Sequence, residues 1–352
     1  MGTHVPGGKQ MDLASKLKMF SSRVKSGSVK RMYALAQDIH AEEGMPAPLV
    51  FLDMGWCILR YGIGYQEYRG YHFAGKPARL RRTFMTMNHN VALTRELCDR
   101  SLYALFDDKI EFLKHYRDFV GRDWIDVRAA GAAGVAAFCR RHPVVFAKPS
   151  DSFGGQGIER LLSEDIDDYE AFHQRCLDRR QILLEEAIQQ HPVMDELCAD
   201  TINTLRMCTV MVDGKPEHVY TIVRMGVGGS CVDNATSGGI YTWVDPDGVL
   251  RYPCFSDKTG FHYTTHPSTG MAFKGFKIPF YAECVDFALR VAEVEPRMGY
   301  VGWDIAVTPD GPILVEANII PGYDMPQNSA WHPQGEGALP LFEKVLGRKL
   351  PA

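Results

Sequence analysis

The C-terminal stretch "GWDIAVTPDGPILVEAN", residues 302 to 318, constrains the fold more than any other part of the chain. Apolar residues alternate along it on both sides of the Pro-Asp-Gly loop at 309 to 311, a pattern that is typical of a β-hairpin. A three-residue loop places Asp304 opposite Glu316, with Asn318 two residues further along the same face. The sequence therefore predicts an antiparallel ribbon with two carboxylates and an amide on one face.

These three polar side chains suggest a metal site. Carboxylates that face each other across a strand pair lie about 5 Å apart, and each resists ionisation unless a positive charge lies between them. Magnesium prefers oxygen ligands and completes its shell with water and with phosphate oxygens of a nucleotide. We therefore expect Asp304, Glu316 and Asn318 to ligate Mg²⁺ beside a nucleotide. The alternative is an edge hairpin with ordinary surface acids, because sheet faces toward water are routinely polar.

The composition of the 352 residues is that of an ordinary globular chain of two or three domains, with 45% hydrophobic residues and a net charge of -4, which does not favour a nucleic-acid binder. No window predicts a transmembrane span or a secretion signal. Nine cysteines without a C-x-x-C pair indicate buried thiols in a reducing cytoplasm. Residues 1 to 40 hold seven Lys and Arg against two acids, which predicts a solvated helix face or a contact with an anionic surface.

A glycine-rich loop follows a strand in "VVFAKPSDSFGGQGIERL". The predicted strand ends at Lys148. The loop contains Gly154, Gly155 and Gly157, whose backbone N–H groups could bind phosphate oxygens. The spacing is not that of a Walker loop or a dinucleotide-binding fingerprint. A mobile hairpin with an incidental lysine is the alternative.

A second acidic segment, "QILLEEAIQQH", contains a predicted strand over 181 to 184 that runs into Glu185 and Glu186. A strand that ends with an exposed backbone edge beside an acid can hydrogen-bond an adenine ring. The alternative is a pair of solvated acids, since glutamate is seldom buried.

The order of these motifs resembles the ATP-grasp superfamily over residues 105 to 345. The segments "INTLRMCTV", "VDNATSGG" and the C-terminal hairpin are similar to the sugar-transfer associated ATP-grasp branch. The resemblance implies an α+β fold in which two α+β subdomains, residues 105–190 and 191–352, clamp ATP. Residues 1–104 would form a mostly helical N-terminal extension, and they do not resemble the domain that usually precedes an ATP-grasp fold.

The resemblance also implies roles for single residues. Lys148 would contact the α-phosphate and adenine side, and Lys109 in "FDDKIEFLKHY" matches an earlier lysine of the family. The adenine would be held by Glu185 and by the backbone of Glu186 and Ile188. The loop over the β- and γ-phosphates would be Gly154, Gly155, Gln156 and Gly157, with Gln156 where many relatives carry Lys or Arg. The magnesium ligands would be Asp304, Glu316 and Asn318. The residue that contacts the ribose would be either Gln190 or His191.

Arg206 and Arg224 flank a predicted Asp-Gly turn at 213 and 214. A two-residue turn would put the two arginines on opposite faces of the strands, whereas a three-residue loop would put them on the same face. We expect the longer loop, with both guanidinium groups facing the γ-phosphate or an acceptor carboxylate. Surface salt bridges are the alternative. Further candidates are Asn203, Asp233 and Asn234.

The expected activity is that of an ADP-forming ligase that joins a small-molecule carboxylate to an amine through an acylphosphate. Lys148, Arg206 and Arg224 would position and neutralise the reacting groups. The alternatives are a phosphotransferase with the same nucleotide site, and a non-catalytic nucleotide-binding accessory protein in polysaccharide assembly. The sequence offers no nucleophile-elbow context for a hydrolase.

Overall fold

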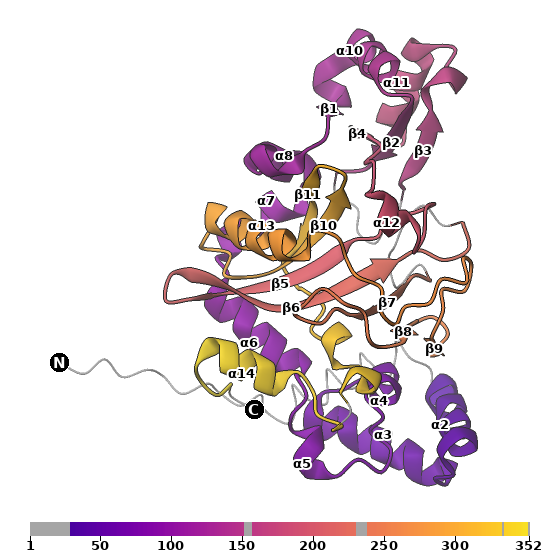
Figure 1. The fold of residues 1–352 in the computed structure, drawn as a ribbon, viewed down its shortest axis with the longest axis vertical. Coiled ribbons are helices and arrows are strands. Elements are labelled where there is room, and N and C mark those ends of the chain that lie inside the picture. The colour runs from indigo at the N-terminus through magenta and orange to yellow at the C-terminus, as the bar shows by residue number, and fades with distance from the viewer. Residues whose placement is uncertain (1–28, 151–156, 230–237, 333, 351–352) are drawn as a thin grey trace, which may run out of the picture.

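A computed structural model describes residues 29–150, 157–229, 238–332 and 334–350. The fold is α+β and contains two sheets, one of four strands in the order β1-β4-β2-β3 and one of seven strands in the order β11-β10-β5-β6-β7-β8-β9. The small sheet lies at one end of the molecule and the N-terminal helices lie at the other, with the large sheet between them (Figure 1).

The N-terminal region is helical, as predicted, and has a hydrophobic core of its own between Met32 and Phe84. Its second helix ends at a glycine, Gly62, in the left-handed conformation (φ 70°) that closes a helix without steric cost. Its helices are α2 (Val29–Glu43), α3 (Ala47–Tyr61), α4 (Tyr65–Gly70) and α5 (Ala78–Arg81).

A run of short helices connects this region to the small sheet. Asp108 caps one of them, α8, by accepting hydrogen bonds from the backbone of the first turn. Phe106 and Tyr116 of this run pack against Trp303 of the large sheet, with ring centroids 6.3 and 5.7 Å apart. The elements are α6 (Met87–Leu97), η1 (Arg100–Leu102), α7 (Tyr103–Asp107), α8 (Lys109–His115) and α9 (Arg117–Val120).

The small sheet carries the predicted lysine strand and the predicted acidic strand. The acidic strand begins two residues later than expected and includes both acids, and it is paired on both sides, with β1 and with β2. The expectation of an exposed backbone edge at Glu185 is therefore wrong, because this strand is central. The elements are β1 (Trp124–Asp126), α10 (Val127–Arg141), β2 (Val144–Lys148), β3 (Glu159–Leu162), η2 (Ser163–Asp165), α11 (Tyr169–Asp178) and β4 (Leu183–Glu186).

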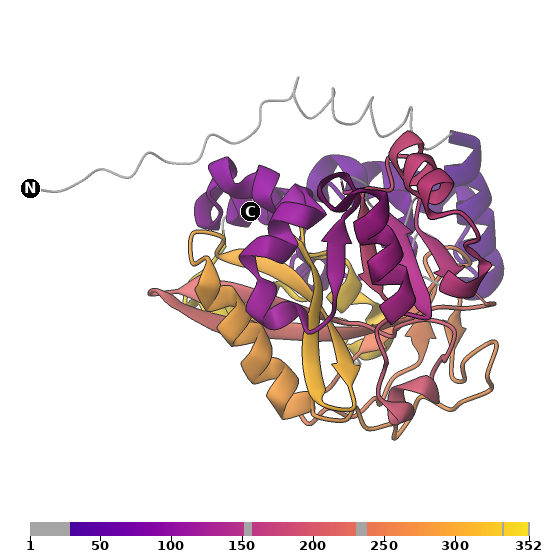
Figure 2. The same cartoon turned by 90° about the horizontal axis from the view of Figure 1, so that it is seen from above.

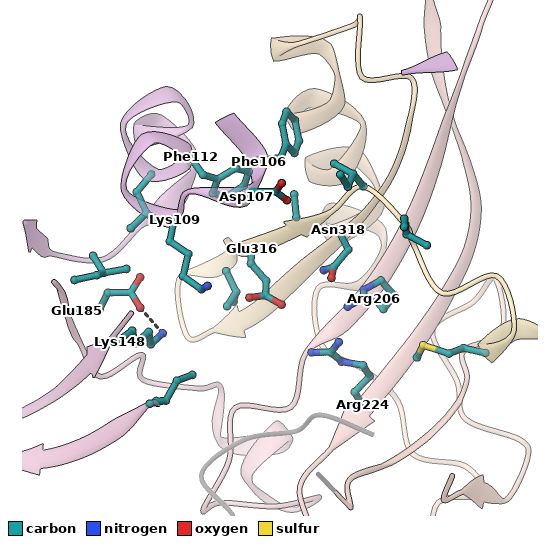
Figure 3. Close-up of a pocket in the computed structure, with 18 of the residues that line it drawn as sticks. Phe106, Asp107, Lys109, Phe112, Lys148, Glu185, Arg206, Arg224, Glu316 and Asn318 are labelled. Carbon is teal, nitrogen blue, oxygen red and sulfur yellow. Dashed lines mark ion pairs between the residues drawn. The ribbon is translucent and has the colours of Figure 1, made fainter. Parts of the chain in front are cut away.

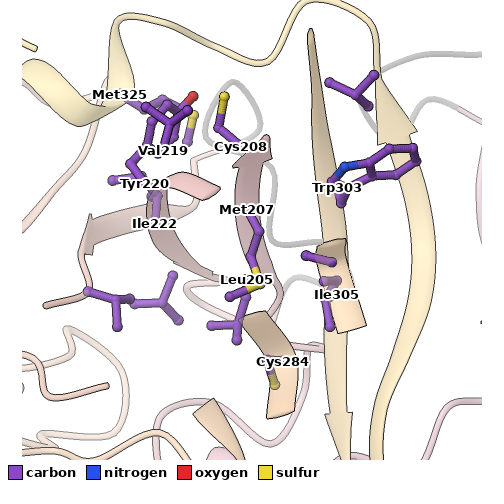
Figure 4. Packing of buried hydrophobic residues seen from close by; sticks show 14 of the residues in the cluster. Leu205, Met207, Cys208, Val219, Tyr220, Ile222, Cys284, Trp303, Ile305 and Met325 are labelled. Atoms are coloured by element: carbon purple, nitrogen blue, oxygen red, sulfur yellow. The ribbon is translucent and has the colours of Figure 1, made fainter. Parts of the chain in front are cut away.

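The large sheet is covered on both faces, so its central strands are almost continuously buried. On one face the Tyr281 hydroxyl donates to Thr221, 3.0 Å away, and on the other Tyr220 packs against Phe342. Figure 2 shows the sheet from above and Figure 4 its buried side chains. The elements are α12 (Pro192–Asp195), β5 (Leu205–Val212), β6 (Lys215–Met225), β7 (Ile240–Trp243), β8 (Cys254–Phe255), β9 (His262–Tyr263), α13 (Tyr281–Val294), β10 (Tyr300–Thr308), β11 (Gly311–Asn318), η4 (Met325–Gln327), η5 (Ser329–Trp331) and α14 (Leu339–Leu346).

Buried residues form three separate cores, in 32–84, in 127–184 and around the large sheet. The helices between 87 and 120 contribute to the core of the large sheet, not to that of the small sheet. The subdomain boundaries at 104 and 190 stay a prediction.

The β10–β11 hairpin has a shorter loop than predicted, because Thr308 pairs with Gly311 and only two residues turn the chain. A β-bulge beside Asp304 supplies the extra residue that the loop lacks. Asp304 therefore pairs with Glu316, as predicted, although the predicted three-residue loop is wrong.

The β5–β6 hairpin shows the same compensation. Its turn has two residues, Asp213 and Gly214, both at positive φ (49° and 77°), as in the tight turns that favour Asp-Gly. The predicted three-residue loop is wrong here too, but a β-bulge shifts the register beyond Cys208. Arg206 consequently pairs with Ile222, and Arg224 lies on the same face two residues later, so the predicted shared face is confirmed.

The eight cysteines within the described residues are free and buried, as expected. None of the described helices is both long enough and apolar enough to cross a membrane.

Candidate active site

A cavity of about 510 Å³ is lined by residues of the small sheet and of the β10–β11 hairpin. Side chains from both sheets and from α7 and α8 point into it (Figure 3). Seven of the predicted site residues line the cavity: Lys109, Lys148, Glu185, Arg206, Arg224, Glu316 and Asn318.

One end of the cavity is formed by an ion-paired cluster. Glu185, in the middle of the small sheet, is 2% exposed and pairs with Lys148 at the end of the neighbouring strand. Arg122 donates to the same carboxylate from Nε (3.0 Å) and from Nη2 (2.6 Å). The interpretation of Glu185 as a solvated acid is therefore wrong, since its charge is buried and paired.

Arg122 also connects the two sheets. Its guanidinium donates to the backbone carbonyls of Leu314 (2.6 Å) and Val315 (3.1 Å) on β11. Burial alone would raise the pKa of Glu185, but Arg122 and then Lys148 outweigh it and hold the pKa at about 2. Arg122 thus keeps Glu185 ionised and fixes it relative to the hairpin that carries Glu316.

At the other end of the cavity, the fully buried Asp304 forms ion pairs with two arginines. Arg206 donates to both of its carboxylate oxygens, at 2.5 and 3.0 Å, and the Arg224 Nη2 lies 3.2 Å from the second oxygen. Burial would raise the pKa of Asp304, but the two arginines lower it. The side chain of Arg206 crosses close to Gly302, where an added Cβ would lie 2.8 Å from its Cδ, so only glycine leaves room for it.

Glu316 and Asn318 face the cavity directly (Figure 3). Asp304 pairs with Glu316 across the hairpin. Burial, and then the charge of Asp304, raise the pKa of Glu316. The amide nitrogen of Asn318 donates to Asp304 across 3.3 Å, which leaves the amide oxygen as a ligand donor.

This donor set fits magnesium, because a cation would relieve the repulsion between Glu316 and Asp304, and because Mg²⁺ binds one or two carboxylates together with phosphate oxygens. Among the residues that the structure describes, no group of three or more His, Cys, Asp and Glu side chains could hold a metal ion. The candidate magnesium ligands are Glu316, the amide oxygen of Asn318, and Asp304. The carboxylate of Asp304 is also bonded to Arg206 and Arg224.

Four predicted adenine and ribose contacts lie outside the cavity lining. Glu186 accepts from the Asp123 backbone (2.8 Å) and pairs with His142 (2.9 Å). Ile188 follows β4 and is partly buried. His191 caps α12, and Gln190 is buried in a network of hydrogen bonds with the loop after α12.

The further candidate Asn203 belongs to the same network, since its amide donates to Gln190 (2.9 Å) and to the carbonyls of Met194 and Cys198. It supports the loop and does not line the cavity. The residues Gly154, Gly155, Gln156, Asp233 and Asn234 lie outside the described residues, while Gly157 is described and adopts φ 74°.

Sequence reasoning missed several residues that line the cavity or support its lining. Arg122 carries no motif, and only the two-sided pairing of β4 reveals that Glu185 needs a buried cation. Asp257 and Asp324 also line the cavity, from loops after β8 and β11. Neither loop follows a periodic pattern that would have placed its acid. The missed apolar walls include Phe106, Phe112, Leu113, Ile158 and Leu183.

Several solved structures have a similar course of the chain. They include D-alanyl-alanine synthetase A from Vibrio cholerae (12% identity, TM-score 0.41, covering 71% of this chain and 63% of that one). Another is the VanG D-Ala:D-Ser ligase from Enterococcus faecalis (15% identity, TM-score 0.44, covering 71% of this chain and 63% of that one). A third is the D-alanine-D-alanine ligase from Coxiella burnetii (12% identity, TM-score 0.43, covering 74% of this chain and 64% of that one). The chain thus spans less than two thirds of each of them.

A comparison with curated protein sequences finds no match. A sequence profile of the sugar-transfer associated ATP-grasp family matches residues 88–345, which include both sheets and every described residue that lines the cavity. The chain belongs to the sugar-transfer associated ATP-grasp family.

Proposed function

We propose that the protein is an ATP-dependent, ADP-forming ligase that joins a small carboxylic acid to an amine, with ATP bound in the cavity between the two sheets. The observation that carries this proposal is the distribution of charge in that cavity. Lys109 and Lys148 reach into it from one side, and Glu316 and Asn318 face them from the other, next to Arg224 (Figure 3).

The cavity offers each part of ATP a matching surface. The apolar side chains near Leu183 and Ile158 suit the faces of an adenine ring, and Lys148 lies beside them. The phosphates would extend from Lys148 toward Glu316, so that Lys109 and Lys148 neutralise their charge.

Glu316 and Asn318 would hold magnesium, with Asp304 beside them. When bound, the metal would neutralise charge on the β- and γ-phosphates. Arg206 and Arg224 lie at the same end, and their planar guanidinium groups suit the γ-phosphate or the carboxylate of the acid.

The reaction balances in two steps. An oxygen of the acid attacks the γ-phosphorus, the bond between that phosphorus and the β–γ bridging oxygen breaks, and ADP leaves with the electron pair. The amine nitrogen then attacks the carbonyl carbon of the acylphosphate, a C–N bond forms, and phosphate leaves with the electrons of the C–O bond. The protein contributes positioning and charge neutralisation, which are its main tasks in phosphoryl transfer.

The test is ADP release from the full chain with Mg²⁺, ATP and a grid of amino acids, sugar acids and amino sugars. The ligase predicts ADP and free phosphate in equal amounts, dependent on an acid and an amine together. Hydroxylamine in place of the amine should trap the acylphosphate as a hydroxamate. A stable phosphorylated product without free phosphate would replace the ligase with a phosphotransferase, and nucleotide binding without turnover would replace it with a binding protein.

A further inference from the structure

A second cavity of about 650 Å³ adjoins the first. The N-terminal helices α2 and α4 form one wall, and β7, β8 and the loop after β8 form the other. Asp257 and Asp324 line both cavities, so the two carboxylates stand where the cavities meet.

We propose that the second cavity binds the acceptor of the reaction, a small polar primary amine, and that Asp257 and Asp324 bind its ammonium group. This inference rests on the proposed function, because it takes the first cavity as the site of ATP and of the acylphosphate. It gives the N-terminal helices, which are not part of either sheet, a role in recognising the acceptor.

The two carboxylates are suited to a cation. Asp257 faces the cavity and accepts a hydrogen bond from the Tyr241 hydroxyl (2.8 Å). Asp257 keeps an exposed surface, but loss of water around its carboxylate, and then the charge of Asp324, raise its pKa to about 6. Burial also raises the pKa of Asp324. An ammonium group between the two carboxylates would lower both pKa values again, since an opposite charge within about 4 to 6 Å favours the ionised form.

The other acids of this cavity, like Asp257, have protein partners. Glu67 accepts from the Tyr323 hydroxyl (2.7 Å), and Asp38 lies 3.8 Å from Arg69 on the neighbouring helix. Asp257 and Asp324 make no ion pair within 4.0 Å among the described residues. They are also the acids nearest to the ATP cavity, which they line themselves.

The remaining walls combine aromatic, polar and cationic groups. The cations are Arg31, Arg69 and Lys258, and Arg69 is paired with Asp38 and Glu42. Tyr241 and Phe255 pack edge to face with ring centroids 6.0 Å apart, and Tyr71 lies on the opposite wall. Asn328, Gln66 and Thr259 add hydrogen-bonding groups around them. Aromatic faces with polar groups at their edges suit a compact polar molecule, such as an amino sugar.

The position of Asp257 and Asp324, where the two cavities meet, also suits the second chemical step, the formation of the C–N bond. An ammonium ion cannot attack a carbonyl carbon, so one proton must leave before the C–N bond forms. Asp257 can accept that proton as a carboxylate. The second proton leaves the nitrogen as the C–O bond to phosphate breaks, and it goes to the departing phosphate or to water.

The test measures binding, not turnover. Saturation-transfer NMR on the full chain, with a non-hydrolysable ATP analogue and Mg²⁺ present, compares glucosamine with glucose and ethanolamine with ethylene glycol. We expect the amines to bind at least tenfold more tightly than their neutral counterparts. We expect Asp257→Asn and Asp324→Asn to abolish this difference, and Asp38→Asn, in the same cavity, to retain it. Thermal unfolding midpoints check that each variant is folded.

A steric variant provides a second measurement. An added Cβ at Gly70, on the α4 wall, meets only Phe255, at 3.9 Å. Gly70→Met should therefore fold, fill the cavity and block the amines while the ATP analogue still binds. Equal binding of amines and neutral compounds, or amine binding that survives both aspartate substitutions or Gly70→Met, would overturn the acceptor site. Failure of the ATP analogue to bind, with amine binding intact, would instead reject the proposed function.

Discussion

Arg206 and Asp304 face each other on the neighbouring strands β5 and β10, and the guanidinium donates to both carboxylate oxygens. Both side chains are almost fully buried, so the ion pair has little access to water. A buried pair of this kind adds little net stability over an apolar pair, but removal of one partner leaves the other charge uncompensated. Arg206 is therefore as much a support for the β10–β11 hairpin as a group that can contact a substrate.

Arg206→Met should lower the free energy of unfolding by about 3 to 5 kcal/mol, because Asp304 would retain only Arg224 as a cationic partner. Urea unfolding of the wild type and the variant measures this difference. The matched control is Arg251→Met, which removes an exposed pair with Asp247 and should cost less than about 1 kcal/mol. Equal losses in the two variants would show that the buried pair has no special role.

Arg122→Met should weaken binding of the ATP analogue and lower stability, since it removes two donors to Glu185 and two donors to carbonyls of β11. The loss of stability should be about 3 kcal/mol, because Glu185 keeps Lys148. Arg122→Lys should recover only part of either effect, since an ammonium group cannot make the bidentate contacts. Calorimetric titration with the analogue measures the affinity. Arg128→Met, which removes an exposed pair with Asp126, should bind the analogue as the wild type does.

Lys148→Met should reduce turnover by about 10²- to 10³-fold, which is the usual effect of removing a group that stabilises developing charge. Steady-state ADP release measures it. Lys114→Met is the control, because Lys114 is exposed on α8 and, among the described residues, forms an ion pair with Glu111 only. A Lys148 variant with wild-type turnover would remove this lysine from the nucleotide site.

The affinity for Mg²⁺ and nucleotide should fall as the pH is lowered from 8 toward 5. The pKa of Glu316 is raised above its ordinary value of 4.5, so the protein without metal holds a proton there that the metal must displace. The same shift makes the contribution of Glu316 to the free energy of unfolding decrease as pH rises through this window, since the folded state holds the proton more tightly than the unfolded chain. Calorimetry in two buffers of different ionisation enthalpy should detect proton release on binding, and Glu316→Gln should show none.

The two hairpins could be predicted from the sequence, because period-2 alternation and tight-turn residues specify them. Lys148 and Glu185 were placed at the cavity by the resemblance to ATP-grasp proteins. The loop lengths could not be predicted. Both hairpins place the extra residue in a bulge, beside Asp304 and beyond Cys208, where no sequence signal distinguishes it from an ordinary strand residue. The predicted faces were right because a bulge and a longer loop change the register by the same single residue.

Contacts between segments far apart in the chain were the other limit. The sequence around Glu185 is that of a solvated acid. In the structure β4 pairs with both β1 and β2, so Glu185 lies inside the sheet, where Arg122 donates a hydrogen bond to it. Asp257 and Asp324 belong to irregular loops, and only the folded chain brings them to one junction.

The most direct test of the account is a titration of Mn²⁺, as a paramagnetic substitute for Mg²⁺, followed by electron paramagnetic resonance in the presence of ADP. The account predicts that the wild type binds the metal with the nucleotide. Glu316→Gln and Asn318→Ala should weaken that binding by about 10- to 100-fold, because the first removes the charge of a carboxylate ligand and the second removes the amide oxygen. Glu283→Gln, at an exposed position of α13, should have no effect. Wild-type metal binding in both Glu316→Gln and Asn318→Ala would contradict the assignment of the β10–β11 hairpin as the metal site.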